Sequence, residues 1–320
     1  MSLCWVSSAA HINNRADGLA SSVNEFTKLG HDVLNISRPG YGGSPVPTSS
    51  TPLQDSIPIF VELIDHVRTE KHNPGVILVG HSLGGALALA IAYEAQEKLP
   101  ILGVSSMGCL PTREPLGLLA ENDPEPQNPR YLVEKKASNV ERFMGKLEWV
   151  NINALSGAVI SSAFEPGKLS RACLRKDANC SVGLKSELRE YESPDFYNYL
   201  TETVIPGVKV AVQFLAAENE VVWDNETASQ GRSLFNDLVS LFQSSTEIEA
   251  EILPHGGHNY EFSKNAGKLL ECRSKFVQKL VSCLNSTTAI AIKLSWSSLR
   301  VRMPEMVMRR KRSLSLLSLF

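Results

Sequence analysis

Ser82 lies in the pattern Gly-x-Ser-x-Gly, within the run VILVGHSLGGAL of residues 76–87. The first four residues of that run are apolar, as in a strand buried on both faces of a parallel sheet, and the small residues after the serine favour a helix. A serine at such a strand-to-helix turn is held in a strained conformation that exposes its hydroxyl, and Gly80 and Gly84 remove the Cβ atoms that would collide. The spacing therefore predicts a nucleophile, with the backbone N–H of Leu83 at the helix start positioned to stabilise an oxyanion.

Two histidines follow a strand predicted over 247–253, and each is a candidate for the general base that a serine nucleophile needs. They are His255 and His258, and the glycines at 256–257 between them give the loop freedom to fold over the edge of the sheet. We expect His258 to be the base, with His255 as the alternative.

Three acidic residues follow a second predicted strand, over 208–215, and they are Glu218, Glu220 and Asp224. Each qualifies by position to accept the ring N–H of the histidine and to stabilise the imidazolium that forms when the base takes a proton. The order along the chain is therefore serine, acid, histidine.

Short apolar runs alternate with helix-like stretches on both sides of the middle of the chain, which is typical of an α/β fold with a parallel sheet. The alternation predicts strands at 33–36, 76–79, 102–106, 208–215 and 247–253, and helices at 53–68, 86–98, 226–242 and 267–284. Residues 111–205 show helical stretches without a clear strand, so we expect a helical insertion there.

The composition is that of an ordinary globular protein, with 320 residues, of which 43% are hydrophobic and 21% charged. Lysine plus arginine total 32 and aspartate plus glutamate total 34, so the net charge of −2 argues against a nucleic-acid partner. The sequence has no run of about 18 apolar residues, so we expect no transmembrane segment. Because the first ten residues do not resemble a signal peptide, we expect a cytoplasmic location. Six cysteines without a Cys-x-x-Cys pair indicate neither a metal site nor a disulfide scaffold.

These motifs together resemble those of the α/β-hydrolase superfamily, over roughly residues 5–284. The run RPGYGGS at 38–44 is similar to the family's loop D-x-x-G-x-G-x-S, with Ser37 in place of the aspartate. The Gly-Gly-His at 256–258 is similar to the segment around the family's catalytic histidine. The resemblance therefore covers the nucleophile, the base and a loop that precedes both in the sequence.

The resemblance also ranks the three candidate acids. Glu220 falls where the family usually has the aspartate of a G-x-x-D loop, which makes it the first choice. Glu218 is the second choice, and Asp224 is a further alternative. A triad of Ser82, Glu220 and His258 is what the resemblance implies.

At the N-terminus, the resemblance implies a strand over 5–10 that ends at His11. The family usually has His-Gly at this point, whereas Ile12 stands here in place of the glycine. The second donor of the oxyanion hole normally comes from just after this dipeptide, so the resemblance implies Ile12 for that role, with Asn13 as the neighbouring alternative.

The expected fold is a mainly parallel α/β-hydrolase sheet with helices on both faces and a helical cap. We expect residues 1–110 and 206–284 to form the two parts of the core and residues 111–205 to form the cap. Residues 285–320 are rich in arginine, lysine and serine, and we expect a basic, disordered tail there.

The resemblance implies a serine hydrolase that needs neither a metal nor an organic cofactor. Its substrate would be a small, apolar or moderately polar ester, thioester or related carbonyl compound, cleaved through an acyl-enzyme. Because a fold does not fix a function, two alternatives stay open. One is a non-catalytic binding protein with this fold, and the other is an acyltransferase or a C–C bond hydrolase that uses the same triad.

Overall fold

The computed structural model describes residues 2–6, 22–40, 44–112, 146, 184–220 and 228–300, with the backbone alone at both ends of this set, over 2–6 and 285–300. The chain divides into two compact units, Met1–Phe276 and Val277–Phe320. The sheet and the candidate site belong to the first unit, which is described below.

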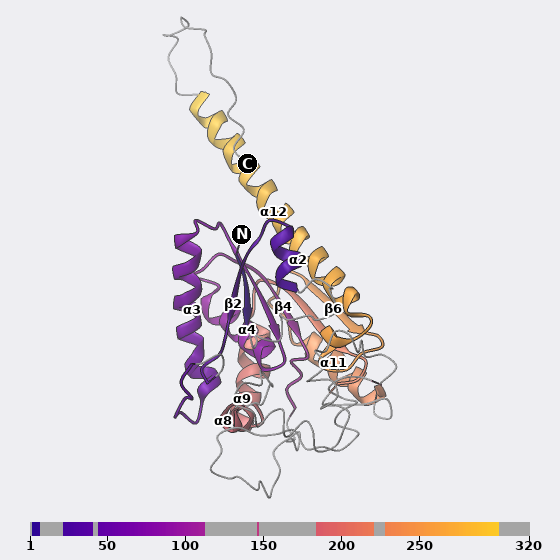
Figure 1. Ribbon diagram of the computed structural model, residues 1–320. Helices are drawn as coiled ribbons and strands as arrows, with labels where there is room; N and C mark the ends of the chain where they lie inside the picture. The colour runs from indigo at the N-terminus through magenta and orange to yellow at the C-terminus, as the bar shows by residue number, and fades with distance from the viewer. Residues whose placement is uncertain are drawn as a thin grey trace, which may run out of the picture. The chain divides into compact units, whose positions relative to one another are not determined.

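A parallel sheet of six strands runs through the first unit in the order β2-β1-β3-β4-β5-β6 (Figure 1). The strands are β1 (Ser2–Val6), β2 (Asp32–Ile36), β3 (Val76–His81), β4 (Ile101–Met107), β5 (Ala211–Ala217) and β6 (Ile248–Leu253). Every neighbouring pair is parallel. Because all carboxyl ends of these strands meet at one edge, the loops that carry the candidate site converge there. The parallel α/β fold predicted from the sequence is confirmed.

Helices surround this sheet (Figure 1). They are α2 (Ser22–Lys28), α3 (Pro52–Glu70), α4 (Leu83–Ala95), α8 (Lys185–Tyr191), α9 (Pro194–Asn198), the π-helix η3 (Tyr199–Val204), α10 (Ile205–Gly207), α11 (Ala228–Ser240), the 3₁₀ helix η4 (Tyr260–Phe262) and α12 (Ala266–Arg300). None of the described helices is both long and apolar enough to cross a membrane.

Both faces of the sheet are covered, as the side chains of β5 demonstrate. Successive residues of a strand point to opposite faces. Phe214 and Ala216 belong to a core that also contains residues of α3, α4 and α11. Leu215 and Ala217 belong to a separate core with Leu269 of α12. The continuous apolar run of this strand is therefore explained by burial on two sides.

The structure differs from the sequence-based expectation at both ends of the chain. The first described strand is Ser2–Val6, so it begins three residues before the expected start at 5, and residues 7–10 lie outside the described part of the chain. The expectation came from family spacing and not from a local pattern. The last helix, expected to end at 284, continues through residues 285–300 as α12. Their sequence, NSTTAIAIKLSWSSLR, has no proline or glycine to end the helix.

The expected cap lies mostly outside the described residues, which omit 113–145 and 147–183. Its last part, from 184 to 205, is helical and contains α8, α9 and η3. The cap itself and the division into domains stay predictions.

Candidate active site

Ser82 occupies a strained turn between β3 and α4. Its backbone has φ 57° and ψ −128°, a left-handed φ that costs a non-glycine residue about 1–3 kcal/mol. A Cβ on Gly80 would lie 2.1 Å from the carbonyl oxygen of Gly84, so only glycine lets the strand and the helix approach this closely. The Ser82 N–H donates to the Met107 carbonyl of β4 at 2.8 Å, which ties the turn to the sheet. The predicted strand-to-helix turn is present.

The N–H of Leu83 is one of the predicted oxyanion donors. Leu83 is the first residue of α4, and N–H groups in the first turn of a helix have no acceptor within that helix. The positive end of the helix dipole adds to the attraction for a developing negative charge. The second predicted donor, at Ile12, lies outside the described residues.

His258 and Glu220 form a buried hydrogen-bonded pair. The distance from His258 Nδ1 to Glu220 Oε2 is 2.5 Å, and the two side chains are 3% and 0% exposed. The other carboxylate oxygen of Glu220 accepts the N–H of Ala217 at 3.0 Å, which fixes its orientation. Because a carboxylate only accepts, Nδ1 is the protonated ring nitrogen, and Nε2 is the basic nitrogen of the neutral imidazole.

The alternative base and the alternative acid contact each other instead. The N–H of His255 donates to Glu218 Oε2 at 2.7 Å, and the His255 ring, with 59% of its side chain exposed, lies 3.7 Å from the same oxygen. These two residues hold the loop after β6 to the loop after β5. The third candidate acid, Asp224, lies outside the described residues.

Gly108, which the sequence analysis did not single out, fits against the buried pair. It has φ +64°, and a Cβ there would lie 2.9 Å from His258 Cε1 and 3.3 Å from Glu220 Oε1. Gly108 directly follows Met107, whose carbonyl binds the Ser82 N–H. One short segment after β4 therefore contacts both the serine turn and the histidine. The signal in the sequence is the place of Gly108 two residues after the strand predicted over 102–106, which puts it at the carboxyl edge of the sheet.

His81, the residue before the serine, also reaches His258. Its Nε2 lies 2.8 Å from the carbonyl oxygen of His258, and the two rings have centroids 4.7 Å apart. The contact links residues 177 positions apart in the sequence. It brings the loop of His258 against the end of β3, next to Ser82.

Two buried groups beside Glu220 are poor nucleophiles. Burial raises the pKa of the Cys109 thiol to about 12, against the opposing effect of hydrogen bonds that include one to Tyr191. Burial also raises the pKa of the Tyr191 hydroxyl well above its ordinary value, with the charge of Cys109 and Glu220 adding to the rise. Both groups are therefore neutral near pH 7, which leaves Ser82 as the nucleophile candidate.

Helix α8 is fixed to the core by two of its glutamates. Glu187 Oε1 accepts from Arg38 Nε at 3.0 Å in a buried ion pair. The carboxylate of Glu190 accepts the N–H groups of Leu53 and Gln54, at 2.6 and 2.9 Å, and so caps the start of α3. Burial raises the pKa of Glu190 to about 7, although these two hydrogen bonds lower it.

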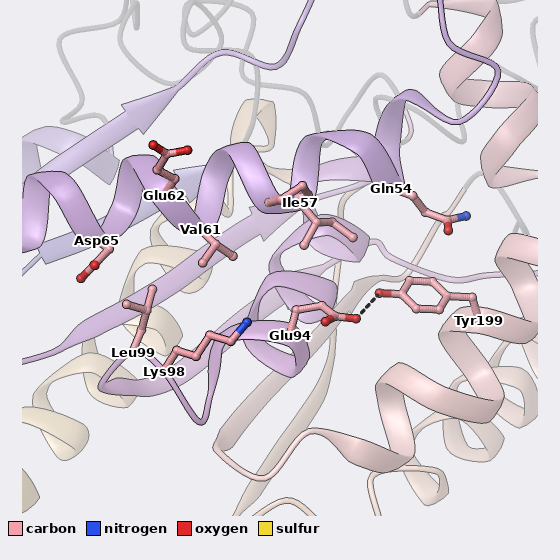
Figure 2. A pocket seen from close by; sticks show the side chains of 10 residues that line it. Gln54, Ile57, Val61, Glu62, Asp65, Glu94, Lys98, Leu99 and Tyr199 are labelled. Atoms are coloured by element: carbon pink, nitrogen blue, oxygen red, sulfur yellow. Dashed lines mark hydrogen bonds between the residues drawn. The ribbon is translucent and has the colours of Figure 1, made fainter.

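A groove of about 580 Å³ lies between α3 and the C-terminal end of α4 (Figure 2). Its floor includes Ile57 and Val61, and the Tyr199 hydroxyl donates to Glu94 at its edge, at 3.3 Å. None of the predicted site residues lines this groove. It is therefore separate from the place where Ser82 and His258 lie.

No three histidine, cysteine, aspartate or glutamate side chains gather as metal ligands within the described part of the chain. The described residues of the site thus offer a hydroxyl, an imidazole, a carboxylate and a helix N-terminus. This is the set of groups that acyl transfer to a serine uses.

Known proteins share this fold. The sequence profile of the alpha/beta hydrolase family matches residues 2–266. No curated protein matches the sequence closely enough to count as a relative. A solved structure of a lipase-esterase related protein from Clostridium acetobutylicum has a TM-score of 0.52 at 18% identity, covering 86% of this chain and 93% of that one. A monoacylglycerol lipase from Paleococcus ferrophilus has a TM-score of 0.54 at 16% identity, covering 88% and 94%.

A third similar structure is the 2-hydroxy-6-oxo-6-phenylhexa-2,4-dienoate hydrolase from a Rhodococcus species, with a TM-score of 0.51 at 14% identity, covering 86% of this chain and 90% of that one. At such identities the solved structures indicate the fold alone. The family profile, by contrast, spans most of the sequence, including the serine turn and the histidine loop. The chain belongs to the alpha/beta hydrolase family.

Proposed function

We propose that the protein is a serine hydrolase that cleaves a small ester, thioester or related carbonyl substrate through a covalent acyl-enzyme. The observation that carries the proposal is the buried pair of His258 and Glu220, with 2.5 Å between Nδ1 and Oε2. This pair lies on loops at the sheet edge that also holds the strained Ser82. An imidazole oriented by a buried carboxylate beside such a serine is the arrangement that activates a hydroxyl nucleophile.

In the first half of the reaction, Ser82 Oγ forms a bond to the substrate carbonyl carbon while its proton passes to His258 Nε2. Glu220 stabilises the imidazolium, and the N–H of Leu83 donates to the oxyanion. The bond to the leaving group then breaks, and the leaving oxygen or sulfur takes the proton from His258. The acyl group stays on Ser82.

In the second half, a water molecule gives a proton to His258 Nε2 and attacks the acyl carbon. Collapse of the second oxyanion breaks the bond to Ser82 Oγ, which takes the proton back. The products are a carboxylic acid and free enzyme. Each group that moves a proton or stabilises charge belongs to the described residues, apart from the second oxyanion donor expected at Ile12.

A fluorophosphonate probe tests this proposal directly, because it labels only a serine that has been activated as a nucleophile. We expect labelling of the wild type on the peptide that contains Ser82, and none after Ser82→Ala. His258→Ala should reduce the labelling rate by about 10³-fold or more. His255→Ala, which changes the exposed alternative, should leave labelling near that of the wild type.

Folded wild-type protein that is not labelled would contradict the proposal and favour a binding protein with this fold. If labelling succeeds, a series of p-nitrophenyl esters of increasing acyl length defines the substrate class. Labelling without turnover of any ester would favour acyl transfer or C–C bond cleavage by the same residues.

A further inference from the structure

We infer that His81 is a positioning residue, which holds the backbone of His258 so that its imidazole keeps one position at the end of β3, where Ser82 follows. The inference rests on the proposed function and deepens it. It assigns a second anchor to the base, in addition to the hydrogen bond that His258 donates to Glu220.

The contact has a defined donor and acceptor. His81 Nε2 lies 2.8 Å from the carbonyl oxygen of His258. Because a carbonyl oxygen only accepts, Nε2 of His81 carries the proton and donates it. The two rings also pack at a centroid distance of 4.7 Å with an interplanar angle of 44°. His81 therefore contacts both the main chain and the ring of the base.

The two ends of this contact differ in rigidity. His81 is the last residue of β3 and pairs with Met107 of β4, so the sheet fixes its backbone. His258 follows β6, in a loop with glycines at 256 and 257. Glycine allows many backbone conformations, so this loop needs contacts elsewhere to hold one of them.

The position of β6 in the sheet makes an anchor necessary. The strand order places β4 and β5 between β3 and β6. With neighbouring strands about 4.8 Å apart, the loop after β6 has to fold back over roughly 14 Å to bring His258 to the end of β3. Glu220, which follows β5, holds the ring from one side. His81, which directly precedes the nucleophile in the sequence, contacts the loop where it reaches the end of β3.

Loss of this anchor should slow catalysis without weakening substrate binding. A displacement of about 1 Å in a catalytic group can cost about 100-fold in rate. We therefore expect a variant without the His81 donor to have kcat reduced by about 10- to 100-fold, with KM within about twofold of the wild type.

Two substitutions separate the hydrogen bond from the bulk of the ring. His81→Phe keeps an aromatic ring and removes the donor, whereas His81→Gln keeps an N–H donor on a flexible side chain. We expect the large loss of kcat in His81→Phe and recovery of most of it in His81→Gln. The matched control is His66→Phe on α3, where the side chain is 73% exposed, and it should keep wild-type kinetics.

A second measurement does not depend on turnover. The proton in the short bond between His258 Nδ1 and Glu220 should give a proton NMR signal far downfield of the amides, because it is held between two strong partners. We expect this signal in the wild type and in His81→Gln. In His81→Phe it should broaden or disappear, since a less fixed ring exposes the proton to exchange with water.

The outcomes separate this inference from the proposed function. If the protein hydrolyses no ester but the downfield NMR signal depends on His81 as described, the role of His81 is supported and the proposed hydrolysis is contradicted. The inference is overturned if His81→Phe keeps both wild-type kcat and the signal, or if the wild type lacks the signal. It is also overturned if His81→Gln is as impaired as His81→Phe while both variants unfold in urea at wild-type concentrations.

Discussion

Replacing Gly108 by alanine tests how closely the base is packed in the site. The new Cβ would lie 2.9 Å from His258 Cε1 and 3.0 Å from its Nδ1. Carbon atoms in van der Waals contact are about 3.5–4.0 Å apart, so the ring would have to move by about 0.5–1 Å. A shift of that size lowers the rate of a well-positioned reaction by about 10- to 100-fold, which is the loss of kcat that we expect.

The same substitution also strains the backbone, and a second glycine provides the control. Gly108 has φ +64° and Gly30, before β2, has φ +81°, but a Cβ on Gly30 would meet nothing within 4 Å. A left-handed φ costs alanine about 1–2 kcal/mol at either position. Gly30→Ala should therefore lose a comparable free energy of unfolding and keep wild-type kcat.

Urea unfolding and ester hydrolysis, measured on both variants, separate strain from displacement. We expect both variants to have a lower free energy of unfolding and only Gly108→Ala to have a reduced kcat. Wild-type kcat in Gly108→Ala would refute the reasoning, because His258 would then tolerate the shift that the contacts require. Equal loss of kcat in Gly30→Ala would also refute it, since general destabilisation would explain both results.

Three further predictions concern the charged groups. Glu220→Gln should lower kcat by about 10²- to 10⁴-fold, because an amide no longer holds the required tautomer of His258, and it should cost less than Ser82→Ala in the same ester assay. The pKa of Glu190 is raised from 4.5 to about 7 by burial, so the folded state binds this proton more tightly than the unfolded state. The free energy of unfolding should therefore fall as pH rises through that interval, and urea titrations of Glu190→Gln should lack this contribution. Arg38→Met should cost about 3–5 kcal/mol in urea unfolding, because it removes the two hydrogen bonds that Arg38 donates to the buried carboxylate of Glu187. The control Arg68→Met, at a more exposed pair with Asp65, should cost less than about 1 kcal/mol.

Local patterns in the sequence predict most strands of the sheet. The apolar runs at 76–79 and 208–215 predict β3 and β5 because these strands are buried on both faces. The position of β1 was expected from the spacing of the family's motifs, and the strand begins earlier in the chain. The end of α12 was also missed, since a shift in composition is not a signal that stops a helix.

The residues of the candidate site also differ in how well the sequence predicts them. Ser82 and His258 stand in motifs whose glycines are local and visible in the sequence, and Glu220 follows a clear strand. The roles of Gly108 and His81 depend on contacts with a loop far away in the chain, so their positions in the sequence indicate the edge of the sheet but not these contacts. The sequence does not show which distant segments lie close together, whereas the folded sheet does.

The place of β1 in the sheet has a consequence for how the chain can assemble. This five-residue strand is bonded on one side to β2 and on the other to β3. Within the described sheet, β2 joins the other strands through β1 alone. During synthesis, the first two strands emerge as a pair that has to wait for β3 before either is built into the sheet. A peptide that occupied the β3-facing side of β1 would separate the pair of β1 and β2 from the sheet, while the strands from β3 to β6 stay bonded to one another.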